Sequence, residues 1–202
     1  MRSRARQTLD PELLLRAYAL GWFPMGTGRR NRIEWFSPDP RGILPLDTFR
    51  TPSRLARTVR QQRFTVAIDT AFEAVMRACA RRDETWITED IVTSYVSLHR
   101  LGHAHSVETW QDGVLVGGLY GVALGGAFFG ESMFHTVTDA SKVALVALVE
   151  RLRARAFTLL DTQWVTPHLA QFGGVEIPRA EYLVRLTAAL ASPCHFTGPD
   201  VH

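Results

Sequence analysis

The sequence has few cysteines, no long apolar run and almost no lysine, and each shortage argues against a class of protein. The two cysteines, Cys79 and Cys194, lie far apart, and neither belongs to a Cys-x-x-Cys pair. This argues against a disulfide framework or a zinc site and makes a reducing cytoplasm the expected location. Because no run of about 18 apolar residues occurs, we expect no membrane span and no membrane partner. The basic start, residues 1–6, leads into no apolar segment, so we expect no secretory signal.

The chain has a single lysine, Lys142, and arginine supplies the other Lys or Arg positions. A GC-rich genome, whose codons favour arginine, is the simplest explanation. The arginines nevertheless recur at helical spacings, and arginine-rich faces suit phosphate groups. Such a face is more often merely solvated, so these groups alone leave nucleic-acid binding open. The groups are Arg50, Arg54, Arg57, Arg60 and Arg63, then Arg77, Arg81 and Arg82, then Arg151, Arg153 and Arg155.

The length of 202 residues, with 46% hydrophobic and 21% charged residues, is that of a globular chain with one core and room for a small annex. We predict a small N-terminal α/β annex over residues 1–50 and a larger domain over residues 51–202. Periodicity, caps and breaks set the elements. The predicted helices are 9–21, 51–63, 71–82, 89–101, 140–155, a short one after Thr166, and 178–191. The predicted strands are 33–37, 43–46, 64–68, 106–111, 114–124, 127–134, 157–164 and 175–177.

This order places an antiparallel meander before a long helix and further strands. Turns at Asp112-Gly113 and Gly125-Gly126 join the meander strands. The order is typical of the α+β class, with a mixed sheet flanked by helices. Three local details are also predicted: an aromatic turn at 22–26, a cap at Asp69 or Thr70 for the helix 71–82, and a frayed tail from Ser192.

Two catalytic motifs are absent from the sequence. No Gly-x-Ser-x-Gly elbow occurs, which argues against a serine hydrolase. No His-Glu-x-x-His occurs either, and Gly102 interrupts the helix on which His99 and His103 would lie one turn apart. We therefore expect His99, His103 and His105 to cap or to form hydrogen bonds rather than to bind a metal.

Polar side chains occur where apolar strands end, and such strand ends often open to a cleft. Asp161 and Gln163 end an apolar strand and, on a regular strand, would point to the same face. They either handle a proton or brace the strand end. Glu131 lies between apolar residues and needs a partner, which is either a ligand amine or an internal cation such as Lys142.

Ten segments of the sequence, in order, match one family. They are Ala17–Met25, Trp35–Gly42, Trp86–Thr88, Leu101–Glu108, Gly117–Gly121, Gly130–Phe134, Ala140–Lys142, Asp161–Gln163, Leu169–Gly174 and Glu176–Arg179. Through them the chain, from about residue 9 to 184, resembles the leucyl/phenylalanyl-tRNA–protein transferases, bacterial aminoacyltransferases of the N-degron pathway. The order of elements is similar to the acetyltransferase-like fold, whose mixed sheet is flanked by helices.

The resemblance implies an enzyme that takes leucine or phenylalanine, and less readily methionine, from its charged tRNA. The enzyme joins this residue by a peptide bond to an N-terminal arginine or lysine of an acceptor protein, which marks that protein for degradation. The resemblance implies no metal and no coenzyme. Because the donor is already an ester, no ATP is needed at this step. The expected partners are aminoacyl-tRNA and acceptor proteins or peptides.

The resemblance also implies roles for particular residues. The catalytic residues are Asp161 and Gln163 as a pair, with Glu131 as the contact for the donor α-amine or the cationic acceptor terminus. The pocket for the donated side chain is lined by Leu119, Met133, Leu145, Leu148 and Leu152, with Ser132 as a nearby hydrogen-bond donor. The platform for the tRNA 3′ adenosine is Trp35, Phe36 and Trp86. The contacts for the acceptor-stem phosphates are Arg77, Arg81 and Arg82.

The three helical leucines of this pocket, Leu145, Leu148 and Leu152, fall on one helical face. Such a stripe would serve equally well as plain core. Relatives often have aromatic residues at the positions of Leu148 and Leu152, so the balance between leucine and phenylalanine stays open. Phe36 replaces a tryptophan that relatives often have, and still offers a π-face.

Two other functions remain as alternatives. An acyl-CoA-dependent N-acyltransferase on the same fold would need a glycine-rich cradle for pyrophosphate before the helix, and residues 135–139 contain no glycine. A non-catalytic RNA-binding module would explain basic and aromatic patches. It gives no reason for Asp161, Gln163 and Glu131 to meet in a pocket.

Overall fold

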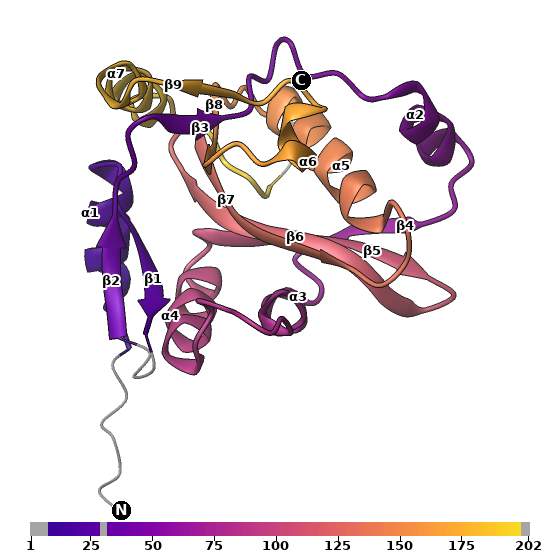
Figure 1. Ribbon diagram of the computed structural model, residues 1–202, viewed down its shortest axis with the longest axis horizontal. Helices are drawn as coiled ribbons and strands as arrows, with labels where there is room; N and C mark the ends of the chain where they lie inside the picture. Colours follow the sequence, from indigo (N-terminus) through magenta and orange to yellow (C-terminus); the bar gives the residue numbers. More distant parts are fainter. Residues whose placement is uncertain (1–7, 29–31, 199–202) are drawn as a thin grey trace, which may run out of the picture.

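The computed structural model describes residues 8–28 and 32–198, and the basic start at residues 1–6 lies outside this part (Figure 1). A two-stranded antiparallel sheet pairs β1 (Phe23–Thr27) with β2 (Arg32–Phe36). The main sheet of the described chain has seven strands. No helix in these residues is both long and apolar enough to cross a membrane.

The centre of the main sheet is the predicted meander of β5 (Ala104–Gln111), β6 (Val114–Leu124) and β7 (Ala127–His135). Helix α5 (Ala140–Ala154) then leads into β8 (Leu159–Gln163), which runs parallel to β7. An antiparallel meander joined through a helix to a parallel neighbour makes the sheet mixed. The predicted α+β class, with a mixed sheet flanked by helices, is therefore confirmed.

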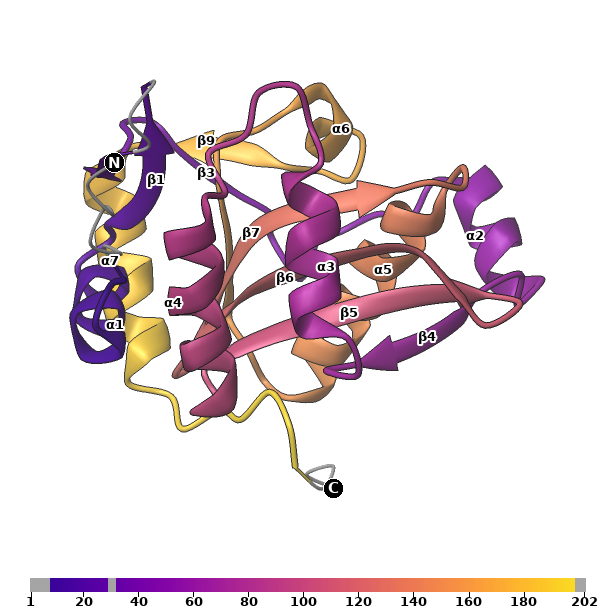
Figure 2. The ribbon, with the colours of Figure 1, turned by 90° about the horizontal axis from the view of Figure 1, so that it is seen from below.

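The outer strands lie on both sides of this centre, and helices cover both faces. Strand β4 (Thr65–Ile68) pairs with β5 at one edge. Figures 1 and 2 show α3 (Phe72–Ala80) and α4 (Glu89–Arg100) on one face and α5 on the other, with α2 (Ser53–Arg60) beyond it. One apolar core lies under α3 and α4, and a second lies under α5.

Strand β3 (Arg41–Ile43) lies between β8 and β9 (Val175–Ile177) and is antiparallel to both. The helix α1 (Pro11–Ala19) packs near α7 (Arg179–Leu190) at the same end of the sheet. A Cβ on Gly42 would lie 2.5 Å from the backbone of Trp164, which explains a glycine where β3 meets β8. The division into two domains at residue 50 stays a prediction; β3, which precedes that boundary, is a strand of the main sheet.

Three local predictions are wrong. Residues 23–27 form β1 rather than an aromatic turn. Helix α3 has no side-chain cap, because the Asp69 carboxylate instead accepts the Ser106 N–H at 2.8 Å and bonds to His105 at 2.7 Å. The tail beyond Ser192 is anchored as far as Phe196, whose buried ring stacks on Phe128. These contacts bridge distant parts of the chain, which local patterns do not report.

Strands β7 and β8 are paired over a short length only. Their register runs from Ala127 with Leu159 to Phe129 with Asp161, and no pairing continues beyond this point in the described residues. Strand β7 goes on to His135 without β8 beside it. The two strands therefore diverge after Phe129, and side chains from both can face the space between them.

Candidate active site

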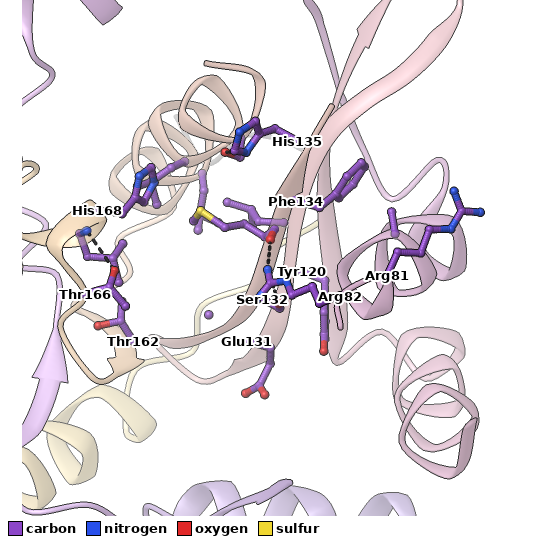
Figure 3. Close-up of a pocket in the computed structure, with 18 of the residues that line it drawn as sticks. Arg81, Arg82, Tyr120, Glu131, Ser132, Phe134, His135, Thr162, Thr166 and His168 are labelled. Carbon is purple, nitrogen blue, oxygen red and sulfur yellow. Dashed lines mark hydrogen bonds between the residues drawn. The ribbon is translucent and has the colours of Figure 1, made fainter. Parts of the chain in front are cut away.

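A cavity of about 1170 Å³ opens where β7 and β8 separate (Figure 3). Its walls come from β6, β7, α3, α5, the end of β8 and the short helix α6 (Pro167–Ala170), with β1 also contributing. Most of these elements belong to the main sheet and its packed helices. Side chains that face the cavity are therefore held on rigid supports, which is the usual arrangement of a binding site.

The apolar part of the cavity contains four of the five predicted pocket residues. Leu119 and Met133 are cross-strand partners on β6 and β7, and Leu145 and Leu148 face them from α5. Leu152 differs: it is completely buried in the core and does not line the cavity. Of the three leucines on this helical face, Leu145 and Leu148 therefore line the cavity, and Leu152 belongs to the core.

Glu131 lines the same cavity on β7 and is held by two tyrosines. The hydroxyl of Tyr18 donates to Oε1 at 2.7 Å, and the hydroxyl of Tyr95 lies 3.5 Å from Oε2. The two hydroxyls also contact one another. Burial raises the pKa of the Glu131 carboxyl to about 8, although the hydrogen bond from Tyr18 opposes this shift. The alternative pairing with Lys142 does not form, since that ammonium lies 3.0 Å from the Asp139 carboxylate.

Asp161 is fully buried and paired with an arginine. The guanidinium of Arg41 donates to Oδ1 at 3.0 Å and to Oδ2 at 2.6 Å, and the hydroxyl of Tyr182 donates to Oδ2 at 2.7 Å. The backbone N–H of Gln163 donates to Oδ1 at 2.8 Å. Asp161 does not line the cavity. Its carboxylate therefore joins β3, β8 and α7 inside the protein.

Gln163 lines the cavity, although Asp161 does not, because the strand geometry changes at this residue. Gln163 has a left-handed backbone with φ of 59°, which breaks the regular alternation of side chains. The hydrogen bond from its N–H to Asp161 stabilises this conformation. The side-chain Nε2 is buried and has no hydrogen-bond partner among the described residues. The expectation that both side chains share one face is thus not met, yet their backbones are directly coupled.

The three predicted phosphate-binding arginines all line the cavity, but they differ in their partners. Arg77 forms ion pairs with Glu73 and Glu89, both at 2.8 Å. Arg82 donates to the Met133 carbonyl at 2.5 Å. Within the part of the chain that the structure describes, Arg81 has no side-chain partner. It is therefore the arginine most available to a bound anion.

The predicted adenosine platform is divided in the structure. Trp86 lines the cavity, whereas Trp35 and Phe36 do not, and both of these pack against the core under α3 and α4. The neighbouring strand β1 instead brings Phe23 and Met25 to the cavity. One flat ring of the predicted three is therefore available on the cavity side.

The predicted hydrogen-bonding roles of two histidines are confirmed. His99 Nδ1 lies 2.8 Å from the Ala104 carbonyl, and His105 bonds to Asp69 and to the Gly102 carbonyl. No cluster of three or more potential metal-binding side chains gathers in the described residues.

Sequence reasoning missed the residues that support the acids. Arg41 and Tyr182 surround Asp161, and Tyr18 and Tyr95 hold Glu131. One feature of the sequence indicated such a residue. Tyr18 lies on the apolar stripe of α1, and a buried tyrosine hydroxyl needs a hydrogen-bond partner. Nothing in the local sequence of Arg41 marks it as buried.

Comparison with known families places the chain among the transferases. The model of the leucyl/phenylalanyl-tRNA protein transferase family matches residues 43–187. The model of the N-terminal domain of the same family matches residues 7–39.

Curated relatives agree with this placement. The leucyl/phenylalanyl-tRNA–protein transferase of Gloeobacter violaceus is 60% identical over 94% of this chain and 98% of its own length. That of Paramagnetospirillum magneticum is 61% identical over 93% of this chain and 92% of its own length. The chain therefore belongs to the leucyl/phenylalanyl-tRNA protein transferase family.

Similarity to solved structures is weak. L-PGS from Bacillus licheniformis is 14% identical, with a TM-score of 0.41 over 77% of this chain and 53% of that one. A conserved protein of unknown function from Staphylococcus epidermidis is 11% identical, with a TM-score of 0.47 over 87% of this chain and 67% of that one. At these scores neither likeness carries an argument.

Proposed function

We propose that this chain transfers leucine or phenylalanine, and less readily methionine, from aminoacyl-tRNA to the N-terminal arginine or lysine of acceptor proteins. Family membership supports the reaction. One observation supports placing the reaction in this cavity: its apolar part is continuous with the side chains of Glu131 and Gln163. We also infer that the enzyme works in the cytoplasm, where charged tRNA is available.

The apolar hollow is the proposed site of the donated side chain. Leu119, Met133, Leu145 and Leu148 offer no hydrogen-bonding groups, so they favour leucine and phenylalanine over polar residues. Leucine and phenylalanine differ in shape, and a flexible methionine can adapt to both. Ser132, at the cavity wall beside Met133, is proposed to donate a hydrogen bond to the aminoacyl group.

The reaction is aminolysis of an ester. The acceptor α-amine, in its neutral form, forms a C–N bond to the ester carbon, and the C–O bond to the tRNA 3′-oxygen breaks. The amine loses one proton, and the leaving oxygen gains one. Glu131 is proposed to hold the donor α-ammonium group, whose positive charge favours the ionised carboxylate over the protonated form that burial favours in the empty site. The Gln163 amide is proposed to hydrogen bond to the attacking amine or the oxyanion.

Asp161 is proposed to act as a positioning residue rather than as a base. Its two oxygens already accept hydrogen bonds from Arg41, Tyr182 and the Gln163 N–H. Because these oxygens are occupied and the side chain does not line the cavity, a substrate amine in the cavity has no direct contact with this carboxylate. Its contribution is instead the left-handed backbone that brings Gln163 to the cavity.

The tRNA is proposed to approach from the α3 side. Arg81 has no side-chain partner within the described chain and suits a backbone phosphate, and Trp86 offers a ring for the 3′ adenine. Arg77 and Arg82 would also bind phosphates, by exchanging their present protein partners for phosphate oxygens. Trp35 and Phe36 pack against the same core as Trp86. They are proposed to support the position of Trp86 rather than to stack on the adenine themselves.

Transfer of labelled leucine from leucyl-tRNA to a peptide that begins with arginine tests the function. We expect incorporation that depends on the charged tRNA and is absent with a peptide whose α-amine is acetylated. An RNA-binding module would retain the tRNA without transfer, and an acyl-CoA-dependent enzyme would label the peptide only from acyl-CoA. Either outcome would rule out the proposed reaction.

A further inference from the structure

Residues 162–168 form one wall of the cavity, and, apart from Gln163, the proposed function assigns this wall no contact with the aminoacyl-tRNA. Figure 3 shows Thr162, Thr166 and His168 on one side of the cavity and Arg81 and Arg82 on the other. If the tRNA occupies the arginine side, then the 162–168 wall is the side left for the second substrate. This wall begins beside Gln163, which is the residue proposed to meet the attacking amine.

Besides Nε2 of Gln163, two polar atoms of this wall are buried and unsatisfied. Neither Oγ1 of Thr162 nor Nε2 of His168 has a hydrogen-bond partner among the described residues, and both residues line the cavity. Buried polar atoms are almost always paired in folded proteins, so unpaired ones in a cavity wall point to a ligand that pairs with them. Burial, followed by the charges of Lys142 and His135, lowers the pKa of His168. Its ring is therefore neutral at pH 7 and can serve as donor or acceptor.

Trp164 supplies an exposed aromatic surface on the same wall. Its side chain lines the cavity and is 43% exposed. One part of the ring system is fixed by an edge-to-face contact with Phe23, with ring centroids 5.4 Å apart. Its backbone is fixed by the close approach of Gly42. The indole is therefore both rigid and accessible.

The charges of the cavity make this surface important for a cationic substrate. Among the described lining residues Glu131 is the one carboxylate, whereas Arg77, Arg81 and Arg82 are cationic. Glu131 is already assigned to the donor α-ammonium group. An acceptor side chain with a positive charge consequently needs another favourable contact, and the face of an indole attracts guanidinium and ammonium groups.

We propose that residues 162–168 form the acceptor subsite, in which the Trp164 indole stacks on the cationic side chain of the first acceptor residue. The Thr162 hydroxyl and His168 Nε2 pair with polar groups of the acceptor backbone. The subsite deepens the proposed function and rests on it. Trp164 is thereby a specificity-determining residue, while the bond-forming step remains with the groups described above.

The test compares steady-state transfer by the wild-type chain and by Trp164→Leu, with leucyl-tRNA saturating. The acceptors are two peptides that differ only at the first residue, arginine in one and citrulline, its uncharged isostere, in the other. We expect Trp164→Leu to raise KM for the arginine peptide about tenfold, and for the citrulline peptide about twofold or less. KM for leucyl-tRNA should stay within twofold of the wild-type value. Trp164→Phe, which keeps a weaker π-face, should fall between the two proteins.

Two further variants separate this effect from a structural one. Trp22→Leu alters a tryptophan that is also 43% exposed but does not line the cavity, and it should leave both peptide KM values unchanged. Thr162→Val preserves shape and should raise KM for both peptides severalfold, without changing the preference for arginine. Should Trp164→Leu fail to fold, Trp164→Phe and Thr162→Val still decide the matter.

The subsite is overturned if Trp164→Leu or Trp164→Phe retains the wild-type preference for arginine over citrulline, or if the loss appears in KM for leucyl-tRNA. Failure of the proposed function looks different, because the wild-type chain would then transfer no leucine to the arginine peptide at all.

Discussion

Replacing Glu131 with glutamine tests the carboxyl group that borders the cavity. Glutamine has nearly the same shape and keeps an oxygen that can accept the hydrogen bond from Tyr18, now 2.7 Å long. The fold is therefore expected to persist, while the ionisable proton is lost. Comparing this variant with the wild-type chain isolates the titration of one group, because all other titrating residues are common to both.

The direction of the effect follows from the two pKa values. In the unfolded chain the Glu131 carboxyl titrates near its ordinary 4.5, and in the folded chain near 8. Below pH 4.5 both states carry the proton, so the titration of Glu131 does not change the free energy of unfolding. Between 4.5 and about 8 the unfolded state has lost its proton and the folded state retains it. The free energy of unfolding therefore falls as the pH rises through this window and levels off above about 8.

Each tenfold change in proton affinity is worth about 1.36 kcal/mol, so a pKa rise from 4.5 to about 8 sets an upper limit of roughly 5 kcal/mol. Water in the open cavity stabilises the ionised form and lowers this figure. We expect the wild-type chain to lose about 2–3 kcal/mol relative to Glu131→Gln between pH 5 and pH 8.5. For a chain of this size that is a relative drop in Tm of about 5–10 °C.

Urea unfolding of both proteins at pH 5, 6, 7, 8 and 8.5 measures this difference. The quantity of interest is the wild-type free energy of unfolding minus that of Glu131→Gln, and it should decrease steadily with pH. Parallel pH profiles would refute the reasoning, since they would mean that the folded chain ionises Glu131 as readily as the unfolded chain does. A difference that grows with pH would imply that the carboxylate has an undetected cationic partner.

Two further predictions concern the ion pair and the tRNA. Asp161→Asn should lower the free energy of unfolding by about 3–5 kcal/mol, because it leaves the buried Arg41 unpaired. In urea unfolding, the double variant Arg41→Met with Asp161→Asn should recover most of this loss. Additive losses in the double variant would contradict the pairing. Arg81→Glu should weaken binding of charged tRNA and reduce the slope of log K against log salt by about one. Arg100→Glu, at the end of α4 and outside the cavity lining, is the control, and equal slopes for both variants would remove Arg81 from the tRNA path.

The order of elements could be predicted from the sequence because it depends on local patterns. Thr88 and Asp10 are residue types that favour helix starts and cap α4 and α1, and the predicted Asp112-Gly113 turn joins β5 to β6. Helical spacing also predicted that Leu145 and Leu148 share a face, and both reach the cavity. Each of these features is set by residues within a few positions of one another.

The support of the site could not be predicted in this way. Arg41 and Asp161 are 120 positions apart, and Tyr18 and Glu131 are 113 apart. Their contacts depend on β3 entering the main sheet beside β8, which no local pattern specifies. The left-handed backbone at Gln163 has the same origin, since it is stabilised by a carboxylate that Arg41 holds in place. The roles assigned to individual site residues stay predictions until the variants are measured.

The meeting of Arg41, Asp161 and Tyr182 has a consequence for biosynthesis. These three residues come from β3, β8 and α7, which are far apart along the chain, so a nascent chain cannot complete their contacts until α7 has left the ribosome. Until β8 has followed, a partly synthesised chain carries an unneutralised Arg41 guanidinium where its interior will form, and until α7 has followed, Asp161 lacks the hydrogen bond from Tyr182. A polypeptide that stops short of α7 should therefore remain both inactive and prone to clearance by cellular proteases.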